Sequence, residues 1–398
     1  MIKRILEARL EAELAEYPVV TVFGPRQSGK TTLVRMSCPG FGYVSMEDKE
    51  TREAAATDYK AFFANHPTPL IIDEVQRLPE IVTAVQTIVD SRRDVCGQFI
   101  LTGSQQTQLA EAVDESLAGR TSILDLLPLS VVELSDGLND ATTDECMTRG
   151  FMPELHAHRK NAFNYYRNYF RTYVERDVRR LVNIKNLLQF ERFVSLLAGR
   201  VGQVVNFTSL ANETGVSVST ISAWLSVLEA SFLVFRLPPY FANIAKRVVK
   251  SPKVYFTDVG LVSYLLGIET PAQLKSHPLR GSLFENMVVA EIRKSFTNSG
   301  REPRMSFYRT EKGFEIDVIV SVADKVVPIE IKSSMTYGKN LTRNLEAYCE
   351  SDSSAISPLL VYDGVAMKDL GTHCICAKNW RKIGGVSGLP AGCRQDSH

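Results

Sequence analysis

The spacing of apolar and polar residues divides the chain into three parts. Between residues 18 and 129, short apolar runs rich in β-branched residues alternate with longer charged stretches, which is typical of buried parallel strands joined by helices. These runs are 18–23, 41–46, 69–72, 98–101 and 123–129. Residues 155–197 contain neither Pro nor Gly and predict helices. We therefore expect an α/β fold, with domains at residues 1–150, 151–275 and 276–398.

The first apolar run leads into a glycine-containing loop and then into the start of a helix. The loop and the first helical residue are Gly24, Pro25, Arg26, Gln27, Ser28, Gly29, Lys30, Thr31 and Thr32. The two glycines allow backbone conformations that a side chain would forbid, so the N–H groups of the loop can converge on a β-phosphate. Lys30 would reach the β- and γ-phosphates, and the Thr31 hydroxyl would bind Mg²⁺. The pattern predicts an ATP–Mg²⁺ site; the alternative is a glycine turn that matches by chance.

Two later runs end in polar residues that would meet this loop. Asp73 and Glu74 follow the run at 69–72. Because parallel strands share one carboxyl edge, we expect Asp73 to hold Mg²⁺ through a water and Glu74 to polarise the attacking water. The run at 98–101 leads to Thr102 and Ser104, either of which could contact the γ-phosphate. The alternatives are an exposed acidic turn and an ordinary strand-to-turn junction.

Arg120 stands at the entrance to the run at 123–129. An arginine in this place can complete the active site of a neighbouring copy as a finger, which would require a homo-oligomer, a hexamer or another ring. The alternative is a surface arginine that pairs with Glu111 or Asp114.

Residues 206–229 predict a helix-turn-helix with Gly215 in the turn. Residues 232–237 and 254–257 would form the two strands of a wing, joined by a loop that carries Lys246, Arg247 and Lys250. The arrangement resembles a winged helix. Its second helix would present Ser219, Thr220 and Ser222 to a DNA major groove. These are small hydroxyl side chains without an arginine among them, so DNA contact and a purely architectural lid both remain open.

The C-terminal part carries a second group of charged residues. Residues 314–320 alternate, so Phe314, Ile316, Val318 and Val320 should share one face, with Asp317 on the other. The following strand pairs back as a hairpin and places Glu330 and Lys332 on one face. Glu285 would arrive from a helix over 282–294. We expect Glu285, Asp317 and Glu330 to bind a divalent metal, and Glu330 and Lys332 to take part in phosphodiester cleavage. The alternative is a chance Glu-Ile-Lys strand end.

Composition and charge narrow the cell compartment and the partners that we expect for the protein. The net charge is +1, so any nucleic-acid contact must come from a local patch. Seven scattered cysteines indicate reduced thiols in a cytosol. The N-terminus becomes acidic too soon for a signal peptide, and no apolar run is long enough to span a bilayer. We expect a cytoplasmic protein without a membrane partner.

The first group of motifs, Gly24 to Thr31, Asp73-Glu74, Ser104 and Gly119-Arg120, resembles the AAA+ ATPase module of prokaryotic ATP-binding proteins that carry a C-terminal domain of unknown function. The C-terminal group resembles the restriction-endonuclease-like PD-(D/E)XK core and archaeal Holliday-junction resolvases. These resemblances imply ATP and Mg²⁺ as cofactors and DNA, branched DNA included, as a partner. Two functions follow as hypotheses. One is an ATP-driven enzyme with metal-dependent DNA cleavage; the other is a nucleotide-gated DNA- or protein-binding regulator with an inactive nuclease-like fold.

Overall fold

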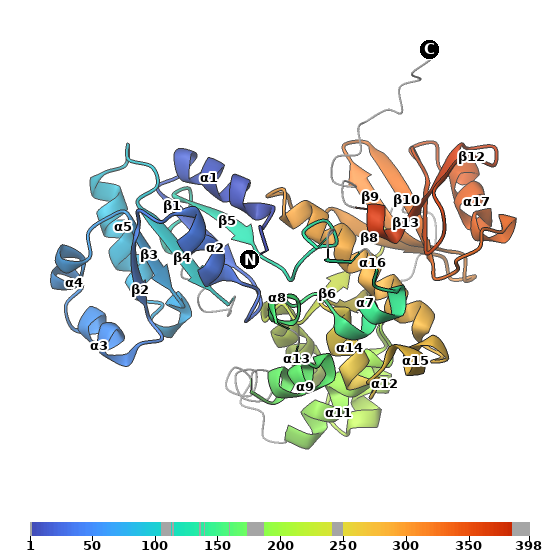
Figure 1. The fold of residues 1–398 in the computed structure, drawn as a ribbon, viewed down its shortest axis with the longest axis horizontal. Coiled ribbons are helices and arrows are strands. Elements are labelled where there is room, and N and C mark those ends of the chain that lie inside the picture. The colour runs from blue at the N-terminus through green and yellow to red at the C-terminus, as the bar shows by residue number, and fades with distance from the viewer. Residues whose placement is uncertain are drawn as a thin grey trace, which may run out of the picture.

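The computed structural model places the three parts of the chain side by side, with helix α16 (Arg280–Thr297) between the N-terminal and C-terminal sheets (Figure 1). The structure describes residues 2–104, 113, 115–134, 137–138, 140–158, 160–172, 187–240 and 250–383. The predicted helical stretch at 173–186 lies outside these ranges, and so do Glu111 and Asp114.

Five parallel strands form the N-terminal sheet in the order β2-β3-β4-β1-β5. They are β1 (Val19–Phe23), β2 (Gly42–Ser45), β3 (Leu70–Asp73), β4 (Phe99–Gly103) and β5 (Thr121–Asp125). β1, β3 and β4 are buried along their whole lengths, which explains their nearly continuous apolar sequences. Since all pairs are parallel, the carboxyl ends of these three strands lie at one edge of the sheet.

Helices cover both faces of this sheet. α1 (Leu6–Glu16) and α2 (Lys30–Ser37) pack on one face. α3 (Lys49–Thr57), α4 (Tyr59–Asn65) and α5 (Ile81–Ser91) cover the other. The sequence of α5 shows why: Ile81, Val82, Val85 and Val89 recur at helical spacing, and all four are fully buried.

The middle part consists of short helices and one strand pair. The helices are α7 (Thr143–Arg149), α8 (Pro153–Ala157), α9 (Ala162–Tyr169), α11 (Leu187–Ala198), α12 (Phe207–Thr214), α13 (Val218–Ala230), α14 (Val259–Leu265) and α15 (Pro271–Lys275). β6 (Val234–Leu237) pairs antiparallel with β7 (Lys253–Phe256). α7 packs against α14 and α15, so residues that we placed before the boundary at 150 share the core of the middle part.

The expected helix-turn-helix corresponds to α12 and α13. Gly215 joins them with a φ of 74°, a left-handed conformation that glycine adopts without steric cost. The side chain of Asn206 caps α12 and that of Ser217 caps α13. Of the basic residues in the expected wing loop, Lys250 is described, while Lys246 and Arg247 lie outside the described ranges. The winged-helix assignment stays a prediction.

Six strands form the C-terminal sheet in the order β12-β13-β11-β10-β9-β8. They are β8 (Met305–Arg309), β9 (Glu315–Val322), β10 (Lys325–Lys332), β11 (Leu359–Tyr362), β12 (Met367–Leu370) and β13 (Ile375–Asn379). α16 packs on one face and α17 (Arg343–Ser351) on the other. The face under α16 shares one continuous apolar core with the middle helices, so the middle and C-terminal parts bury their apolar surface together.

The expected arrangement of apolar side chains along β9 is wrong in one respect. Val318 and Val320 belong to the core under α16, whereas Phe314 and Ile316 face α17. The pairing of β8 with β9 shifts between Ser306 and Tyr308, which is a β-bulge. The extra residue reverses the alternation, so the two pairs of apolar residues lie on opposite faces of the sheet.

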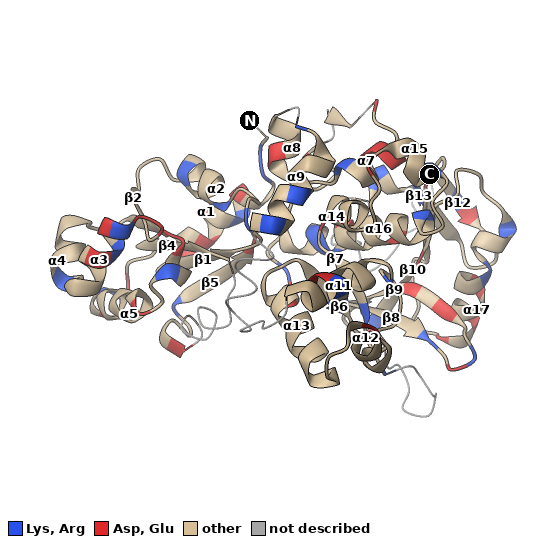
Figure 2. Cartoon of the chain, turned by 90° about the horizontal axis from the view of Figure 1, so that it is seen from below, with Lys and Arg blue, Asp and Glu red and all other residues tan. Residues whose placement is uncertain are grey.

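Charged residues of both signs are spread over all three parts (Figure 2). Within the described ranges, no helix is both long and apolar enough to cross a membrane. The six cysteines in those ranges are all free.

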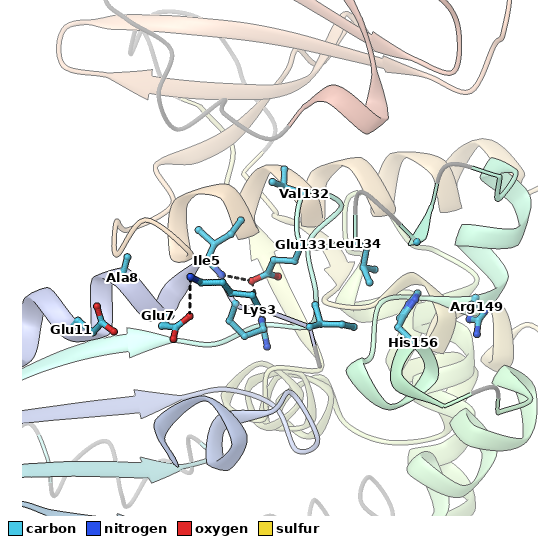
Figure 3. A pocket seen from close by; sticks show the side chains of 13 residues that line it. Lys3, Ile5, Glu7, Ala8, Glu11, Val132, Glu133, Leu134, Arg149 and His156 are labelled. Atoms are coloured by element: carbon cyan, nitrogen blue, oxygen red, sulfur yellow. Dashed lines mark hydrogen bonds and ion pairs between the residues drawn. The ribbon is translucent and has the colours of Figure 1, made fainter. Parts of the chain in front are cut away.

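Arg4 connects the N-terminal sheet with the residues that follow its last strand, β5. Its guanidinium donates to the carbonyls of Ser28 and Leu127, both at 2.7 Å, and to Glu133 Oε1 at 3.0 Å. Glu133 also accepts the backbone N–H of Ile5 at 2.8 Å, beside a cavity of about 730 Å³ (Figure 3). The side chain of Glu133 is fully buried. The pair therefore fixes the phosphate-binding loop, the end of β5 and the segment after it, residues 126–134, which we call the linker, relative to one another.

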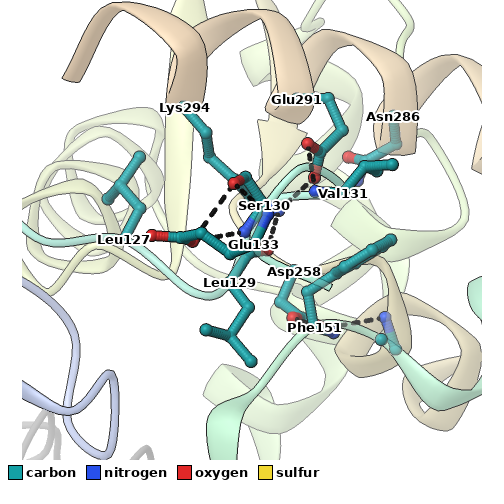
Figure 4. A network of polar contacts seen from close by, with 12 residues as sticks. Leu127, Leu129, Ser130, Val131, Glu133, Phe151, Asp258, Asn286, Glu291 and Lys294 are labelled. Carbon is teal, nitrogen blue, oxygen red and sulfur yellow. Dashed lines mark hydrogen bonds and ion pairs between the residues drawn. The ribbon is translucent and has the colours of Figure 1, made fainter. Parts of the chain in front are cut away.

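A second buried pair continues from this linker to α16 (Figure 4). Glu291 accepts the backbone N–H of Val131 at 2.9 Å. Lys294 donates to Glu291 at 2.6 Å and to the carbonyl of Leu129 at 2.9 Å. The linker is therefore held by charged groups on both sides, by Arg4 and Glu133 toward the N-terminal sheet and by α16 toward the C-terminal part.

We predict that Arg4→Met lowers the free energy of unfolding by about 3 kcal/mol, because it leaves the Glu133 carboxylate buried without its cation. Chemical denaturation followed by circular dichroism measures the change. Lys3→Met is the matched control: Lys3 is exposed, and within the described residues its ion pair is with Glu7, so we expect a change within about 0.5 kcal/mol. Equal effects of the two substitutions would contradict the role of Arg4.

Candidate functional site

The loop between β1 and α2 has the conformation expected of a phosphate-binding loop. Gln27 and Gly29 have φ values of 63° and 95°, so the backbone turns through the left-handed region twice. A Cβ at Gly24 would collide with the carbonyl of Leu126. α2 begins at Lys30, directly after the loop, and therefore directs its free N–H groups toward the loop.

Lys30 is 5% exposed and folds back on its own loop. Its Nζ donates to the carbonyls of Gly24 at 2.9 Å and Pro25 at 3.0 Å. Burial lowers the pKa of Lys30 to about 8, although the charges of Glu74 and Asp73 oppose this effect. The side chain is thus prepared for the negative charge of a phosphate, which would restore the stability of its ammonium form.

Asp73, at the end of β3, lies beside Thr31 as the sequence predicts. Thr31 Oγ1 donates to Asp73 Oδ2 at 2.8 Å. The hydroxyl of Thr102 on β4 donates to Asp73 Oδ1, and the hydroxyl of Tyr43 on β2 donates to Oδ2 at 2.8 Å. Burial and the bond to Asp73 raise the pKa of Tyr43 to about 12. A hydroxyl and a carboxylate side by side fit Mg²⁺, which takes oxygen ligands; Thr31 and Asp73 would hold it, and it would neutralise phosphate charge.

Glu74 is held by a neighbour that the sequence did not single out. Its φ of 56° is left-handed, which is uncommon for a residue with a side chain and occurs at functional sites. Gln76 Nε2 donates to Glu74 Oε2 and, at 3.2 Å, to Ser104 Oγ. Gln76 is 8% exposed and Ser104 is 2% exposed. The amide therefore ties the carboxylate after β3 to the hydroxyl after β4.

A cavity of about 800 Å³ opens over this edge of the sheet. One wall contains Gln27, Gly29, Lys30, Thr31, Thr32 and Glu74. The opposite wall is the polar face of α9, including Asn164, Tyr165 and Asn168. The hydroxyl of Tyr165 donates to Gln27 Oε1 at 2.6 Å and so links the two walls. The volume is within the range of pockets for small molecules and cofactors. Lys30, Thr31 and Glu74 come together here, while α9 could not be assigned to the site from sequence spacing.

Arg120 lies at the opposite, amino-terminal end of its strand. Its guanidinium pairs with Asp90 through two bonds of 2.8 and 3.1 Å. Glu111 and Asp114, the partners considered from the sequence, lie outside the described ranges. The bond to Asp90 raises the pKa of Arg120. The assignment of Arg120 as a finger stays a prediction that an assembled form would have to test.

The expected C-terminal carboxylates do come close to one another, but each has a protein partner. Asp317 Oδ2 accepts the N–H of Ile331 at 2.8 Å and Lys332 Nζ at 3.1 Å. Glu330 Oε2 lies 2.5 Å from the same Nζ. Burial and the neighbouring Asp317 raise the pKa of Glu330 to about 8. Glu285 binds Lys253 and Tyr255 instead.

No group of three or more His, Cys, Asp or Glu side chains in the described part of the chain has a geometry that could hold a metal ion. With its lysines in place, the arrangement of Glu285, Asp317 and Glu330 does not fit a divalent cation. The assignment of these residues as metal ligands stays a prediction.

Comparison with known protein families assigns three regions. Residues 16–135 match an AAA domain, residues 140–272 match a domain of unknown function (DUF8612), and residues 280–380 match another (DUF4143). An uncharacterized protein of Mycobacterium tuberculosis and one of Mycobacterium bovis are each 30% identical over 337 residues, which cover 84% of this chain and 74% of theirs.

The chain belongs to this family of AAA-domain proteins. Its N-terminal part is an AAA-type P-loop ATPase domain, and its C-terminal part is a DUF4143 domain. Among solved structures, the Walker-type ATPase PABY2304 of Pyrococcus abyssi is similar with a TM-score of 0.42 and 16% identity, over 67% of this chain and 96% of that one. AMPPCP-bound DnaA of Aquifex aeolicus is similar with a TM-score of 0.29 and 14% identity, over 56% of this chain and 86% of that one.

We predict that nucleotide binding to the AAA domain takes up a proton at about pH 8.5, because phosphate raises the lowered pKa of Lys30. Affinity should therefore fall as the pH rises above about 8. Calorimetry in two buffers of different ionisation enthalpy measures the uptake. At about pH 7 Lys30 is already protonated, so the uptake should be much smaller. Equal uptake at both pH values would contradict the lowered pKa.

We predict that Gln76→Ala reduces kcat for ATP hydrolysis about tenfold, because Glu74 loses a hydrogen bond to its charged group, while nucleotide affinity stays within about twofold. Gln76→Glu adds a second carboxylate beside Glu74, so the acid limb of the kcat profile should move to higher pH. If Gln76 only stabilised the fold, Gln76→Glu would leave the acid limb at the pH of the wild type. Steady-state rates across pH give both results, and an unchanged acid limb in Gln76→Glu would refute the positioning role.

Proposed function

We propose that the protein is a nucleotide-gated regulator, which binds and hydrolyses ATP–Mg²⁺ in its AAA domain and thereby controls how its middle and C-terminal parts engage DNA. The observation that carries this proposal is the contact between Tyr165 and Gln27. A residue of the phosphate-binding loop is bonded directly to a helix of the middle part. A nucleotide in the cavity would compete for the same space, so its presence would change the position of α9.

The chemistry of hydrolysis follows from the groups at the edge of the sheet. Lys30 would contact the β- and γ-phosphates, Thr31 and Asp73 would hold Mg²⁺, and Ser104 would contact the γ-phosphate. Glu74 would orient and polarise the attacking water, with Gln76 holding its carboxylate. Arg120 would act in a homo-oligomer, where it would have to leave Asp90 to reach the site of a neighbouring copy.

DNA as the partner is supported by the helix-turn-helix geometry of α12 and α13. The exposed face of α13 carries Ser219 and Ser222, and almost all of this helix lacks charge (Figure 2). Small hydroxyl side chains can contact phosphates and sugars, whereas bidentate base recognition usually employs arginine, asparagine or glutamine. We therefore propose contact of low sequence specificity, with a protein partner as the alternative.

A metal-dependent nuclease is the second candidate. It is favoured by the closeness of Asp317, Glu330 and Lys332, the residue types that such a reaction needs. It is opposed by the pairing of every one of these carboxylates with a lysine or a backbone N–H. Incubation with linear and branched DNA and Mg²⁺ tests it directly, since cleavage that is lost in Lys332→Ala would establish the nuclease.

The regulator hypothesis predicts that Lys30→Ala abolishes ATP binding, because it removes the ammonium group of the phosphate-binding loop, and that Glu74→Gln binds ATP normally but loses at least about 90% of turnover. Fluorescence anisotropy of labelled DNA, with and without a non-hydrolysable ATP analogue, measures gating. We expect the analogue to change DNA affinity at least about fivefold in the wild type.

Lys60→Ala, at an exposed lysine of α4, is the control and should behave as the wild type. Tyr165→Phe should retain turnover but reduce the effect of the analogue on DNA binding, since it removes the bond to Gln27. Normal ATPase activity in Glu74→Gln would refute the assigned base. DNA affinity independent of nucleotide, in a protein that hydrolyses ATP, would refute gating and leave the ATPase assignment intact.

A further inference from the structure

A lysine of the middle part lies buried among carboxylates of the C-terminal part. Lys253, the first residue of β7, is 1% exposed. Its Nζ lies 3.1 Å from Glu285 Oε1 on α16 and 2.5 Å from Glu315 Oε1 on β9. The hydroxyl of Tyr255, also on β7, donates to Glu285 at 2.6 Å. One strand of the middle part therefore supplies a cation and a hydroxyl to two carboxylates that come from other elements.

The same cluster extends to Asp317 and Glu330, which share the Lys332 ammonium. Two lysines thus face four carboxyl groups, and Arg309 adds a third cation, with its Nη1 3.2 Å from Glu315 Oε2. Glu330 is 1% exposed, and its Oε1 has no hydrogen-bond partner in the part of the chain that the structure describes. A buried carboxylate oxygen without a partner is costly, and it marks a place where a cation would be stabilised.

Burial of like charges explains why cations are held in this cluster. Glu285, Asp317 and Glu330 are close enough to repel one another when ionised, and the interior of a protein screens this repulsion poorly. A hard divalent cation with oxygen ligands would satisfy such a cluster, and so would buried ammonium groups. In this structure the ammonium group of Lys253 serves as such a cation. It bonds to two of the four carboxylates, those of Glu285 and Glu315, and the ring of Phe307 lies 5.5 Å from its Nζ.

We propose that the ammonium of Lys253 is the resident cation of the cluster formed by Glu285, Glu315, Asp317 and Glu330, and that it closes this cluster to divalent metal ions while β7 is docked. The cluster would become a metal site only when the Lys253 side chain is withdrawn or removed. This inference does not depend on ATP hydrolysis, because all the residues involved lie outside the AAA domain.

The test compares Mn²⁺ binding to the nucleotide-free full chain in wild type and Lys253→Met, with free Mn²⁺ counted by electron paramagnetic resonance. We expect the variant to bind one more Mn²⁺ per chain than the wild type. The additional site should disappear in Lys253→Met combined with Asp317→Asn, because the second substitution removes a ligand. Lys250→Met, at an exposed lysine close by in the sequence, is the matched control and should bind as the wild type.

Lys253→Gln serves as a second variant, because its amide can still donate hydrogen bonds to Glu285 and Glu315 if Lys253→Met fails to fold. Circular dichroism checks the fold of each protein. If the wild type binds Mn²⁺ at a site that Asp317→Asn removes, Lys253 does not close the cluster and the proposal is overturned. It is equally overturned if the folded Lys253 variants bind no more Mn²⁺ than the wild type.

Discussion

The guanidinium of Arg4 is the contact on which the arrangement of the ATPase site depends. It bonds at once to the phosphate-binding loop through Ser28, to the end of the sheet through Leu127 and to the linker through Glu133. A fully buried carboxylate such as Glu133 is tolerated only because a cation and two backbone N–H groups, those of Ile5 and Ser130, face it. Beyond the linker, Glu291 and Lys294 of α16 repeat the arrangement, so the position of the loop is coupled physically to the C-terminal part.

The carboxyl edge of the N-terminal sheet shows how neighbouring strands assemble one site. β3 pairs with β4, which brings Thr102 and Ser104 beside Asp73 and Glu74. Three charged groups at this edge have protein partners: Lys30 has loop carbonyls, Asp73 has three hydroxyls, and Glu74 has Gln76. Such prepared donors and acceptors need little reorganisation when phosphate and metal replace some of these partners.

Lysine serves opposite purposes in the AAA domain and in the carboxylate cluster around Lys253 and Lys332. Lys30 is buried with loop carbonyls as its nearest partners, and burial lowers its pKa to about 8. Burial also lowers the pKa of Lys253 and Lys332, but the adjacent carboxylates outweigh it and raise both above the usual value. The first lysine faces an open cavity and is ready for an anion, while the other two already neutralise the carboxylates around them. This difference is why we favour nucleotide chemistry in the N-terminal part and a regulatory role for the C-terminal part.

The sequence determined the elements whose signals are local. Continuous apolar runs predicted β1, β3 and β4, and the order of glycine, lysine and hydroxyl predicted the loop at Gly24 to Thr31, because steric freedom and charge at these positions depend on residue type alone. Only the tertiary structure decided which distant groups meet. Arg4, Gln76 and Tyr165 contact the site through pairings that no spacing predicts, and the bulge in β9 reversed an alternation that the sequence shows as regular. Lys253 is the clearest case: its burial among carboxylates of another part depends on how β7 packs against α16 and β9, and this is set by the shared core and not by any neighbouring residue.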